Sequence, residues 1–288
     1  PDENRMINGF TDYEELTRTR RLIMRSYKLP GNRLRLLHPN ENRGAVTIDE
    51  ERDYHFRYVL EDNFGNRRTY QFIVKGKRQD IPEYKPEANE MLYWNRTNVI
   101  QKPGMELVVP RYYVYEDVPL RTDMRGDSSH IAFDYILDAG RTPIHSYCDL
   151  SIGLRHMPVA DTTKYYIVQK AGKWRSSMGG KYANGWIKTR VRSLGTFSVD
   201  VDTIAPQITP IGQGGWRTSR NIRFRIKDME SGIGSYKVYI DGKFVLFGLK
   251  KGILVIQDPE KVKKGVSHKL EVTVTDQCGN MTRKEYKF

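Results

Sequence analysis

VTVTDQCGN, residues 272–280, alternates apolar and polar side chains and then runs into an Asp, a Gly and an Asn; YVLEDNFGN, residues 58–66, is built the same way. Successive side chains of a strand point to opposite faces, so both stretches predict half-buried β-strands. Asp accepts hydrogen bonds from nearby backbone N–H groups, and Gly and Asn tolerate left-handed backbone dihedrals. We therefore interpret each Asp-x-x-Gly-Asn as the tight turn of an antiparallel hairpin.

Calcium is the competing interpretation of these turns, because Asp and Asn can supply oxygen ligands. A calcium site needs six or more oxygens converging from several groups. Each copy offers one Asp at the turn, Asp62 or Asp276. The pattern favours turns, and the repeat predicts the last hairpin of two related β-sandwich modules.

The same period of two dominates the rest of the chain. Leu270, Val272 and Val274 alternate with polar residues, as do Phe197 and Val199, and Gly and Pro interrupt the strands at short intervals. This pattern predicts an all-β fold of tandem Ig-like or fibronectin-like β-sandwich modules. One short N-terminal helix is expected, because Thr11 and Glu14 have the spacing of a capping box before YEELTRTR.

Two linker-like stretches predict the domain boundaries. KGKRQDIPEYKPE (75–87) is charged and contains Pro. In FSVDVDTIAPQITP (197–210) one strand is expected to end at Asp200 to Asp202, Ile204-Ala205-Pro206 to break the pairing, and a new strand to begin at Gln207. The expected division is a β-sandwich with the short helix over 1–78, a larger middle β-sandwich over 87–202 and a C-terminal Ig-like module over 203–288. Within the last module, Asp241-Gly242 predicts a two-residue hairpin turn.

The basic balance of the chain is the feature that could indicate nucleic-acid binding. Lys and Arg number 48 against 35 Asp and Glu, a net charge of +13. In RNIRFRIKD (220–228) and WIKTRVRS (186–193) the basic residues alternate with apolar ones, which is typical of the solvated faces of half-buried strands. No zinc-finger spacing or phosphate-binding loop accompanies them. Nucleic acid is therefore not the expected partner. The basic residues are expected to form solvated strand faces, or to give weak attraction to anionic envelope polymers.

Membrane spanning and disulfide scaffolding are not indicated either. No apolar run approaches the roughly 20 residues that cross a bilayer, and PDENRMINGF at the start is no export leader, so any such signal is expected to lie upstream or to have been removed. Cys148 and Cys278 are expected to be unpaired core or strand-end thiols.

Several segments carry a family resemblance. DTIAP (202–206), KDMESGIGSYKVYIDGKFVLF (227–247) and HKLEVTVTDQCGN (268–280) resemble the terminal Ig-like module of bacterial cell-envelope proteins. With INGFTDYEEL (7–16), LPGNRLRLL (29–37), YHFRYVLEDNFGN (54–66) and TPIHSYCDLSIG (142–153), they resemble the non-catalytic C-terminal region of lysostaphin-type (LytM-like) zinc peptidases of Gram-negative envelopes. The resemblance implies that a catalytic domain precedes several β-sandwich modules.

The zinc site of that family is the decisive feature to look for. The resemblance implies an H-x-x-x-D pair and a distal H-x-H, since catalytic zinc needs converging protein ligands and one position for water. His145 and Asp149 have the first spacing, but no H-x-H occurs anywhere in the sequence. Residues 144–149 also alternate like a strand, which favours a structural role for both. We therefore expect no catalytic, cofactor-binding or metal-binding residues, no cofactor and no enzyme activity in this chain.

Two further groups of residues leave alternatives open. Asp200 and Asp202 share a strand face beside a linker, where solvated carboxylates are the simpler interpretation and a calcium ion between modules is the other. Trp174 and Trp186 could stack on sugar rings, although Tyr and Trp are ordinary residues of β-sheets.

The β-sandwich modules predict a protein that binds or positions, and the resemblance implies that it is exported to the periplasm or outer surface. Its expected partners are peptidoglycan or other envelope proteins and glycans, and the sequence does not indicate an oligomeric state. The first hypothesis is a tandem β-sandwich region that positions a peptidoglycan-peptidase domain. The second is a free-standing adhesin or glycan-binding protein. The third is a zinc hydrolase centred on His145 and Asp149.

Overall fold

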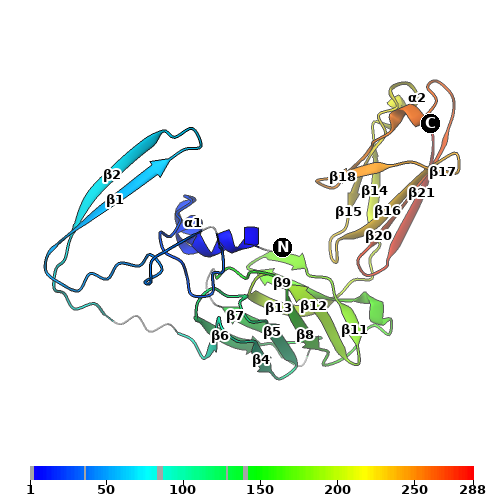
Figure 1. Ribbon diagram of the computed structural model, residues 1–288. Coiled ribbons are helices and arrows are strands. Elements are labelled where there is room, and N and C mark those ends of the chain that lie inside the picture. Colours follow the sequence, from blue (N-terminus) through cyan, green and yellow to red (C-terminus); the bar gives the residue numbers. More distant parts are fainter. Residues whose placement is uncertain (1–2, 36, 83–86, 128, 139–141) are drawn as a thin grey trace. The chain divides into compact units, whose positions relative to one another are not determined.

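The fold is built almost entirely of antiparallel β-strands, as predicted (Figure 1). The computed structural model describes residues 3–35, 37–82, 87–127, 129–138 and 142–288. The chain divides into two compact units, Pro1–Glu87 and Ala88–Phe288. Each unit is described by itself.

The first unit holds little regular structure. Its elements are the 3₁₀-helix η1 (Glu3–Phe10), the helix α1 (Tyr13–Thr19) and the strands β1 (Asp53–Glu61) and β2 (Arg67–Lys75). The predicted helix is present, but its N-cap is Asp12 rather than Thr11. The Asp12 side chain accepts a hydrogen bond from the Glu15 backbone N–H at 3.0 Å, while Thr11 forms an isolated bridge with Met24. Asp and Thr both cap helices well. Asp12 has the extended backbone of an N-cap residue (φ −77°, ψ 94°), whereas Thr11 takes part in the bridge to Met24, so the cap lies one residue further along.

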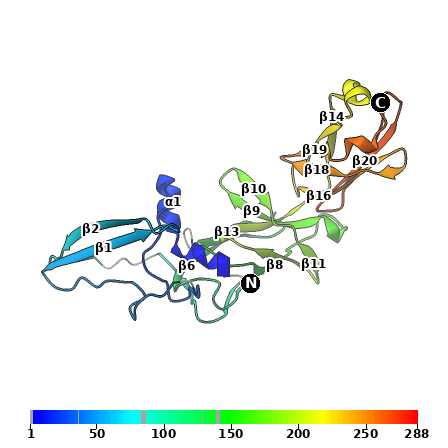
Figure 2. The ribbon, with the colours of Figure 1, turned by 45° about the horizontal axis from the view of Figure 1, so that its top comes forward.

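The expected sandwich over residues 1–78 is not formed by the described residues. Within the described part of the chain, strands β1 and β2 pair only with each other, in register from Asp53 opposite Lys75 to Glu61 opposite Arg67. They form a two-stranded ribbon (Figure 2). The pattern predicted both strands correctly, because alternation depends on neighbouring residues. It could not supply the strands that a sandwich needs in addition.

In the second unit, residues 90–201 form a β-sandwich of two sheets. The six-stranded sheet has the order β10-β9-β13-β7-β6-β3 and the five-stranded sheet the order β11-β12-β8-β5-β4. The elements, in chain order, are β3 (Glu90–Leu92), β4 (Asn98–Lys102), β5 (Met105–Val109), β6 (Val118–Arg125), β7 (Asp134–Asp138), β8 (Cys148–Gly153), η2 (Thr162–Lys164), β9 (Tyr165–Ala171), β10 (Trp174–Ser177), β11 (Lys181–Ala183), β12 (Trp186–Val191) and β13 (Gly195–Val201).

The core of this sandwich lies between its two sheets. Leu107, Leu150 and Ile187 of the five-stranded sheet pack in one cluster with Leu120 and Phe197 of the six-stranded sheet, and all are fully buried. We refer to residues 88–201 as the first sandwich.

Residues 207–287 form a smaller sandwich, the second sandwich, of two four-stranded sheets with the orders β14-β15-β19-β18 and β17-β16-β20-β21. Its elements are β14 (Gln207–Ile211), η3 (Gln213–Gly215), α2 (Trp216–Ser219), β15 (Arg223–Lys227), β16 (Ile233–Ile240), β17 (Lys243–Phe244), β18 (Phe247–Lys250), β19 (Ile253–Ile256), η4 (Pro259–Lys261), β20 (Lys269–Asp276) and β21 (Met281–Lys287). The short helix α2 was not predicted. It buries Trp216, whose Nε1 donates to the Ile211 carbonyl at 2.9 Å.

Side-chain alternation decides which face of each strand is buried. In β15, Phe224 and Ile226 are buried and Arg223, Arg225 and Lys227 are exposed, as predicted. Asp241 and Gly242 have φ values of 51° and 77° and connect Ile240 to Lys243, which confirms the predicted two-residue turn.

Candidate functional site

The candidate site lies where the connector between the two sandwiches meets two turns of the second one. The connector is short, since β13 ends at Val201 and β14 begins at Gln207. Asp202, its first residue, is 1% exposed. We call the site the joint and define it as Asp202, Asp228, Ser231, Asp276 and Asn280, together with Lys164, Tyr166 and Cys278.

Asp202 ties the first sandwich to the second through its backbone and its carboxylate. Its N–H donates to the Lys164 carbonyl at 2.9 Å. Its Oδ2 accepts from the Ser231 backbone N–H at 3.0 Å and from Ser231 Oγ at 2.5 Å, and its Oδ1 accepts from the Ile204 N–H at 2.9 Å. Ser231 is fully buried. A buried carboxylate without such donors would be strongly unfavourable, so these contacts fix the connector.

The turn between β20 and β21 contributes Asp276 and Asn280. Asp276 Oδ1 accepts from the N–H groups of Cys278 and Asn280, both at 2.8 Å, and Oδ2 accepts from Asn280 Nδ2 at 2.8 Å. The same Asn280 amide donates to the Asp202 carbonyl at 3.0 Å. The turn interpretation of Asp-x-x-Gly-Asn is confirmed, and the turn also contacts the connector.

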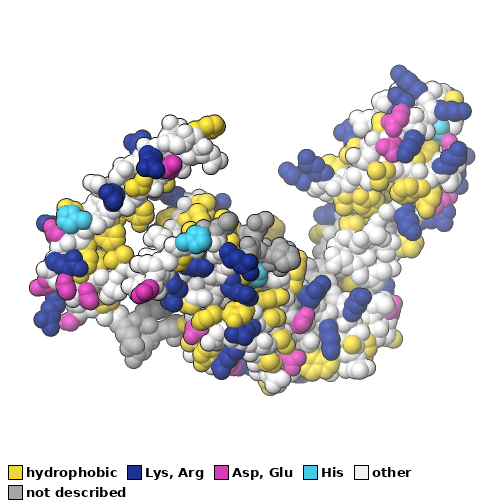
Figure 3. Space-filling view, viewed as in Figure 1, with side chains coloured by type: hydrophobic (Ala, Val, Ile, Leu, Met, Phe, Trp, Pro, Cys, Tyr) yellow, Lys and Arg dark blue, Asp and Glu magenta, His cyan; other side chains and the backbone are white. Residues whose placement is uncertain are grey.

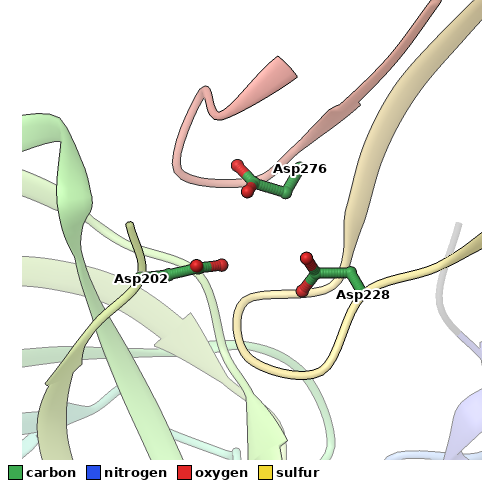
Figure 4. A group of neighbouring side chains, drawn as sticks. All are labelled: Asp202, Asp228 and Asp276. Carbon is green, nitrogen blue, oxygen red and sulfur yellow. The ribbon is translucent and has the colours of Figure 1, made fainter. Parts of the chain in front are cut away.

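Asp228 completes a group of three carboxylates (Figure 4). Its Oδ1 accepts from the N–H groups of Glu230 at 3.1 Å and Gly232 at 2.7 Å. Asp202, Asp228 and Asp276 each place one carboxylate oxygen within 4.8 Å of the others, and the three side chains point toward one another. Burial raises the pKa of Asp276, although its bonds to Asn280 oppose the shift, and the nearby charge of Asp202 adds to it.

The first sandwich supplies the cation and the apolar side of the joint. Lys164 Nζ donates to the Cys278 carbonyl at 3.0 Å, and Cys278 Sγ donates to the Lys164 carbonyl at 3.5 Å. Tyr166 and Val168 of β9 form a buried cluster with Cys278, and burial raises the pKa of the Cys278 thiol to about 11. Tyr166 Oη donates to Glu230 at 3.4 Å. Apolar contact and hydrogen bonds therefore link the two sandwiches at the joint.

The joint combines three neighbouring carboxylates with hydrogen-bond donors from both sandwiches. Of the residues that define the joint, Asp202, Asp228 and Asp276 could ligate a hard divalent cation, and such a cation takes six or more oxygen ligands. Each of the three already accepts at least two hydrogen bonds from protein donors. These bonds account for the geometry without an ion.

The structure separates the two acidic residues that the sequence placed together at this linker. Asp200 forms an ion pair with Arg175 inside the first sandwich, whereas Asp202 is buried in the joint. The interpretation of Asp202 as a solvated carboxylate is therefore wrong. The prediction failed because Asp202 contacts Ser231 in the turn of residues 228–232, which is distant in the sequence.

Sequence reasoning missed Asp228, Ser231 and Lys164. One signal was available for Asp228. Like Asp62 and Asp276, it lies at the end of a strand and precedes a Gly by three or four residues. All three use the carboxylate to accept hydrogen bonds from their own turn. No local pattern indicated Ser231 or Lys164, because their partners belong to other elements.

The pair with zinc-ligand spacing, His145 and Asp149, occupies two different environments. His145 is buried and its Nδ1 lies 3.0 Å from Tyr115 Oη, with the rings of Tyr113 and Tyr115 packed edge-on against it. Asp149 lies exposed on β8, opposite Arg190 of β12. The strand begins at Cys148, so the predicted alternation from Ile144 does not hold. His145 serves the packing of the first sandwich.

The two candidate sugar-stacking residues lie in different sheets. Trp174, on β10 of the six-stranded sheet, is 81% exposed. Trp186, on β12 of the five-stranded sheet, is half-buried, with its ring next to Gly153. They do not share one sheet surface.

Comparison with known proteins gives one family match, over part of the chain. The sequence model of a family described as the Zu5-like domain matches residues 89–202, which is the stretch that folds into the first sandwich and ends at Asp202. A search of curated proteins gives no match. Among the described residues, no helix is long and apolar enough to cross a membrane.

Two solved structures show weak likeness. One is the glycoside hydrolase domain of Endo-D from Streptococcus pneumoniae R6, with 12% identity, a TM-score of 0.21, and coverage of 59% of this chain and 35% of that one. The other is described as a Ca²⁺-stabilized adhesin that helps an Antarctic bacterium to bind ice, with 10% identity, a TM-score of 0.21, and coverage of 82% and 80%. These TM-scores are too low for either likeness to carry an argument.

Proposed function

We propose that residues 88–288 are a non-catalytic spacer, in which the joint holds the two sandwiches in a fixed relation. The observation that carries this proposal is the burial of Asp202 with donors from the connector and from Ser231 of the second sandwich. A flexible linker is typically exposed and rich in Gly and Ser. This connector contains neither between Asp202 and Pro206.

The strength of these contacts supports a stiff joint. A hydrogen bond to a charged group contributes about 1.5–3 kcal/mol, and removing one partner leaves the buried donors unsatisfied. Thr282 Oγ1 also donates to the Pro206 carbonyl at 2.5 Å, which holds the far end of the connector. Bending between the sandwiches would break several of these bonds at once.

The resemblance to LytM-like envelope peptidases gives the spacer its proposed setting. In that setting the chain lies in the periplasm or on the outer surface, where it positions a peptidoglycan-peptidase domain or contacts envelope partners. Sedimentation with purified peptidoglycan at rising salt tests this part. Binding that disappears at moderate salt and does not distinguish peptidoglycan from other polyanions would reflect the charge of +13 alone.

A free-standing adhesin or glycan-binding protein is the second candidate. The observation that favours it is Trp174, which is 81% exposed on an edge strand beside Arg175. Glycan-array binding that is lost in Trp174→Ala, and retained in the matched variant Trp186→Ala, would support this function over the spacer.

Distance measurements between the sandwiches test the spacer most simply. Spin labels at Val99→Cys in the first sandwich and Val266→Cys in the second occupy exposed positions, and buried Cys148 and Cys278 are protected from labelling. Double electron–electron resonance should give a narrow distance distribution for the parent protein and a broad one for Asp202→Ala. Asp200→Ala, which removes only the ion pair with Arg175, is the control and should stay narrow.

A broad distribution in the parent protein would overturn the proposal. The same measurement with added Ca²⁺ and with EDTA shows whether an ion takes part in the joint. Hydrogen bonds alone give identical distributions in both.

A further inference from the structure

The β1–β2 hairpin and the β20–β21 hairpin have the same type of turn, with equivalent hydrogen bonds. Asp62 Oδ1 accepts from the N–H groups of Phe64 and Asn66, both at 2.9 Å, and Oδ2 accepts from Asn66 Nδ2 at 2.8 Å. Asp276 makes the same three bonds with Cys278 and Asn280. The Gly residues also agree, with φ of 82° at Gly65 and 80° at Gly279. The two hairpins can therefore be aligned residue by residue on Asp62 and Asp276.

This alignment shows which face of β1 corresponds to the core face of β20. Leu270, Val272 and Val274 are fully buried in the second sandwich. Their counterparts are Phe56, Tyr58 and Leu60, all apolar or aromatic. Tyr58 is 45% and Leu60 is 65% exposed. The positions that form a core in β20 therefore carry two exposed side chains and the partly buried Phe56 in β1.

Strand β2 gives the same result. In β21, Tyr286 packs against the core of the second sandwich, with its ring 5.9 Å from Trp216 and 5.4 Å from Phe224. Its counterpart Phe72 stacks only on aromatic residues of its own hairpin, among the ring contacts of the described residues, at 5.1 Å from Phe56 and 6.0 Å from Tyr58.

The edges of the two hairpins differ in the same way. Strand β20 pairs with β21 on one side and with β16 on the other, where Val238 lies opposite Val272 and Ile240 opposite Leu270. Within the described residues, β1 pairs with β2 alone. A two-stranded hairpin by itself is marginally stable in water, because its apolar face and its edge stay exposed.

The order of strands in the second sandwich indicates where the missing partners come from. All strands that pair with or cover β20 and β21, from β14 to β19, precede them in the chain. In the first unit, the described residues before β1 contain the short helices and the bridge between Thr11 and Met24, and no strand. The described residues before β1 therefore supply no strand in the place that β14 to β19 take in the second sandwich.

We propose that β1 and β2 are the last two strands of a third Ig-like sandwich, whose other strands are supplied by polypeptide on the N-terminal side of this chain. One of these strands pairs antiparallel with the free edge of β1, in the position that β16 takes beside β20, with apolar side chains alternating in the same way. A facing sheet covers Phe56, Tyr58, Leu60 and Phe72. The hairpin is thus an intramolecular docking surface for β-strands.

Hydrogen exchange measured by mass spectrometry tests this proposal without any mutation. It is measured on this chain and on the polypeptide extended on the N-terminal side as its gene encodes it. Amides of residues 53–61 and 67–75 should exchange quickly in this chain, and at least about tenfold more slowly in the extended one. Residues 269–276 should be protected in both and serve as the internal reference.

Matched variants on the two faces of β1 show which face is covered. In the extended polypeptide, Tyr58→Lys and the milder Leu60→Ala should abolish the added protection. Val59→Lys, on the opposite face, should retain it.

Three results would overturn the proposal. One is a gene that encodes no strand pattern on that side. Another is unchanged exchange of the hairpin in the extended polypeptide. The last is protection in this chain that rises with its concentration, because that would make a second copy the partner of the hairpin.

Discussion

The Asp of the turn that both hairpins contain has a lowered pKa where it is exposed and a raised pKa where it is buried. Asp62 and Asp276 accept the same three hydrogen bonds. The pKa of exposed Asp62 is lowered, chiefly by its bond from the Asn66 side chain. The pKa of Asp276 is raised, because burial outweighs the bonds from Asn280. The turn sets the backbone in both hairpins, and the surroundings set the charge.

We expect the pKa values of these two carboxyl groups to be shifted in opposite directions. In a ¹³C-detected pH titration, Asp62 should titrate below the ordinary Asp value of about 3.9 and Asp276 above it. Because the folded state holds the proton of Asp276 more tightly, its contribution to the stability of the second sandwich falls as pH rises from about 3.9 through the raised pKa. Titration of both groups on the same side of the ordinary value would contradict this.

His268 and Asp241 form an ion pair that should also make the second sandwich less stable as pH rises, in the range above pH 6.5. Burial would lower the pKa of His268, but its bonds to Asp241 at 2.6 Å and to the Lys263 carbonyl at 2.8 Å raise it overall. The stabilisation is fully present below about pH 6.5 and is lost as pH rises through the raised pKa.

Asp241→Asn removes the charge and keeps a residue that tolerates the φ of 51° at this turn. Because Asp241 is half exposed, we expect a loss of about 1 kcal/mol in the free energy of unfolding at pH 6. At pH 9 the loss should be much smaller. Urea unfolding at both pH values measures it, and an equal loss at both would show that the charge does not matter.

At the scale of elements, neighbouring residues in the sequence indicate where a strand forms, but they do not indicate which strand it pairs with. Alternation predicted β1, β2, β15 and β20, and Asp-Gly predicted the turn after β16. The sequence contained nothing that pairs β1 with a third strand, and the structure describes none. Pairing depends on residues far along the chain, which explains why the hairpins were predicted correctly and the sandwich over 1–78 was not.

Gly234 is the element-scale feature with the most direct mechanical consequence. It lies at the irregularity in the β16–β20 pairing, and a Cβ there would approach the Asp276 carbonyl oxygen to 2.5 Å. Because the clash is with backbone, Gly234→Ala should push β20 away from β16 and lower the free energy of unfolding by about 1–3 kcal/mol.

Gly214→Ala is the matched control, since a Cβ at Gly214 meets nothing within 4 Å. It should be neutral or nearly so in the same urea unfolding experiment. If Gly234→Ala is equally neutral, β16 and β20 can move apart without loss of stability, and the close approach of Gly234 to the Asp276 carbonyl is not required.

At the scale of the whole molecule, charge and connection determine what the chain can do. Figure 3 shows Lys and Arg side chains scattered over the face in view, with acidic and apolar side chains between them, which agrees with basic residues on solvated strand faces. The candidate site was only partly predictable. Asp202 and Asp276 were visible as residues next to a linker and in a turn, but only the fold brings Asp228, Ser231 and Lys164 to them.

The central claim is that Asp202 fastens the second sandwich to the first through Ser231. A double-mutant cycle with Asp202→Ala and Ser231→Ala tests it most directly. Unfolding of the second sandwich is followed by fluorescence of Trp216, which is fully buried there, after the exposed or partly buried Trp94, Trp174 and Trp186 are replaced by Phe. We expect each single variant to be destabilised and the double variant to cost less than the two together, with a coupling energy of about 1–3 kcal/mol. Additive losses would contradict the claim, because they would mean that the two side chains do not stabilise the protein through each other.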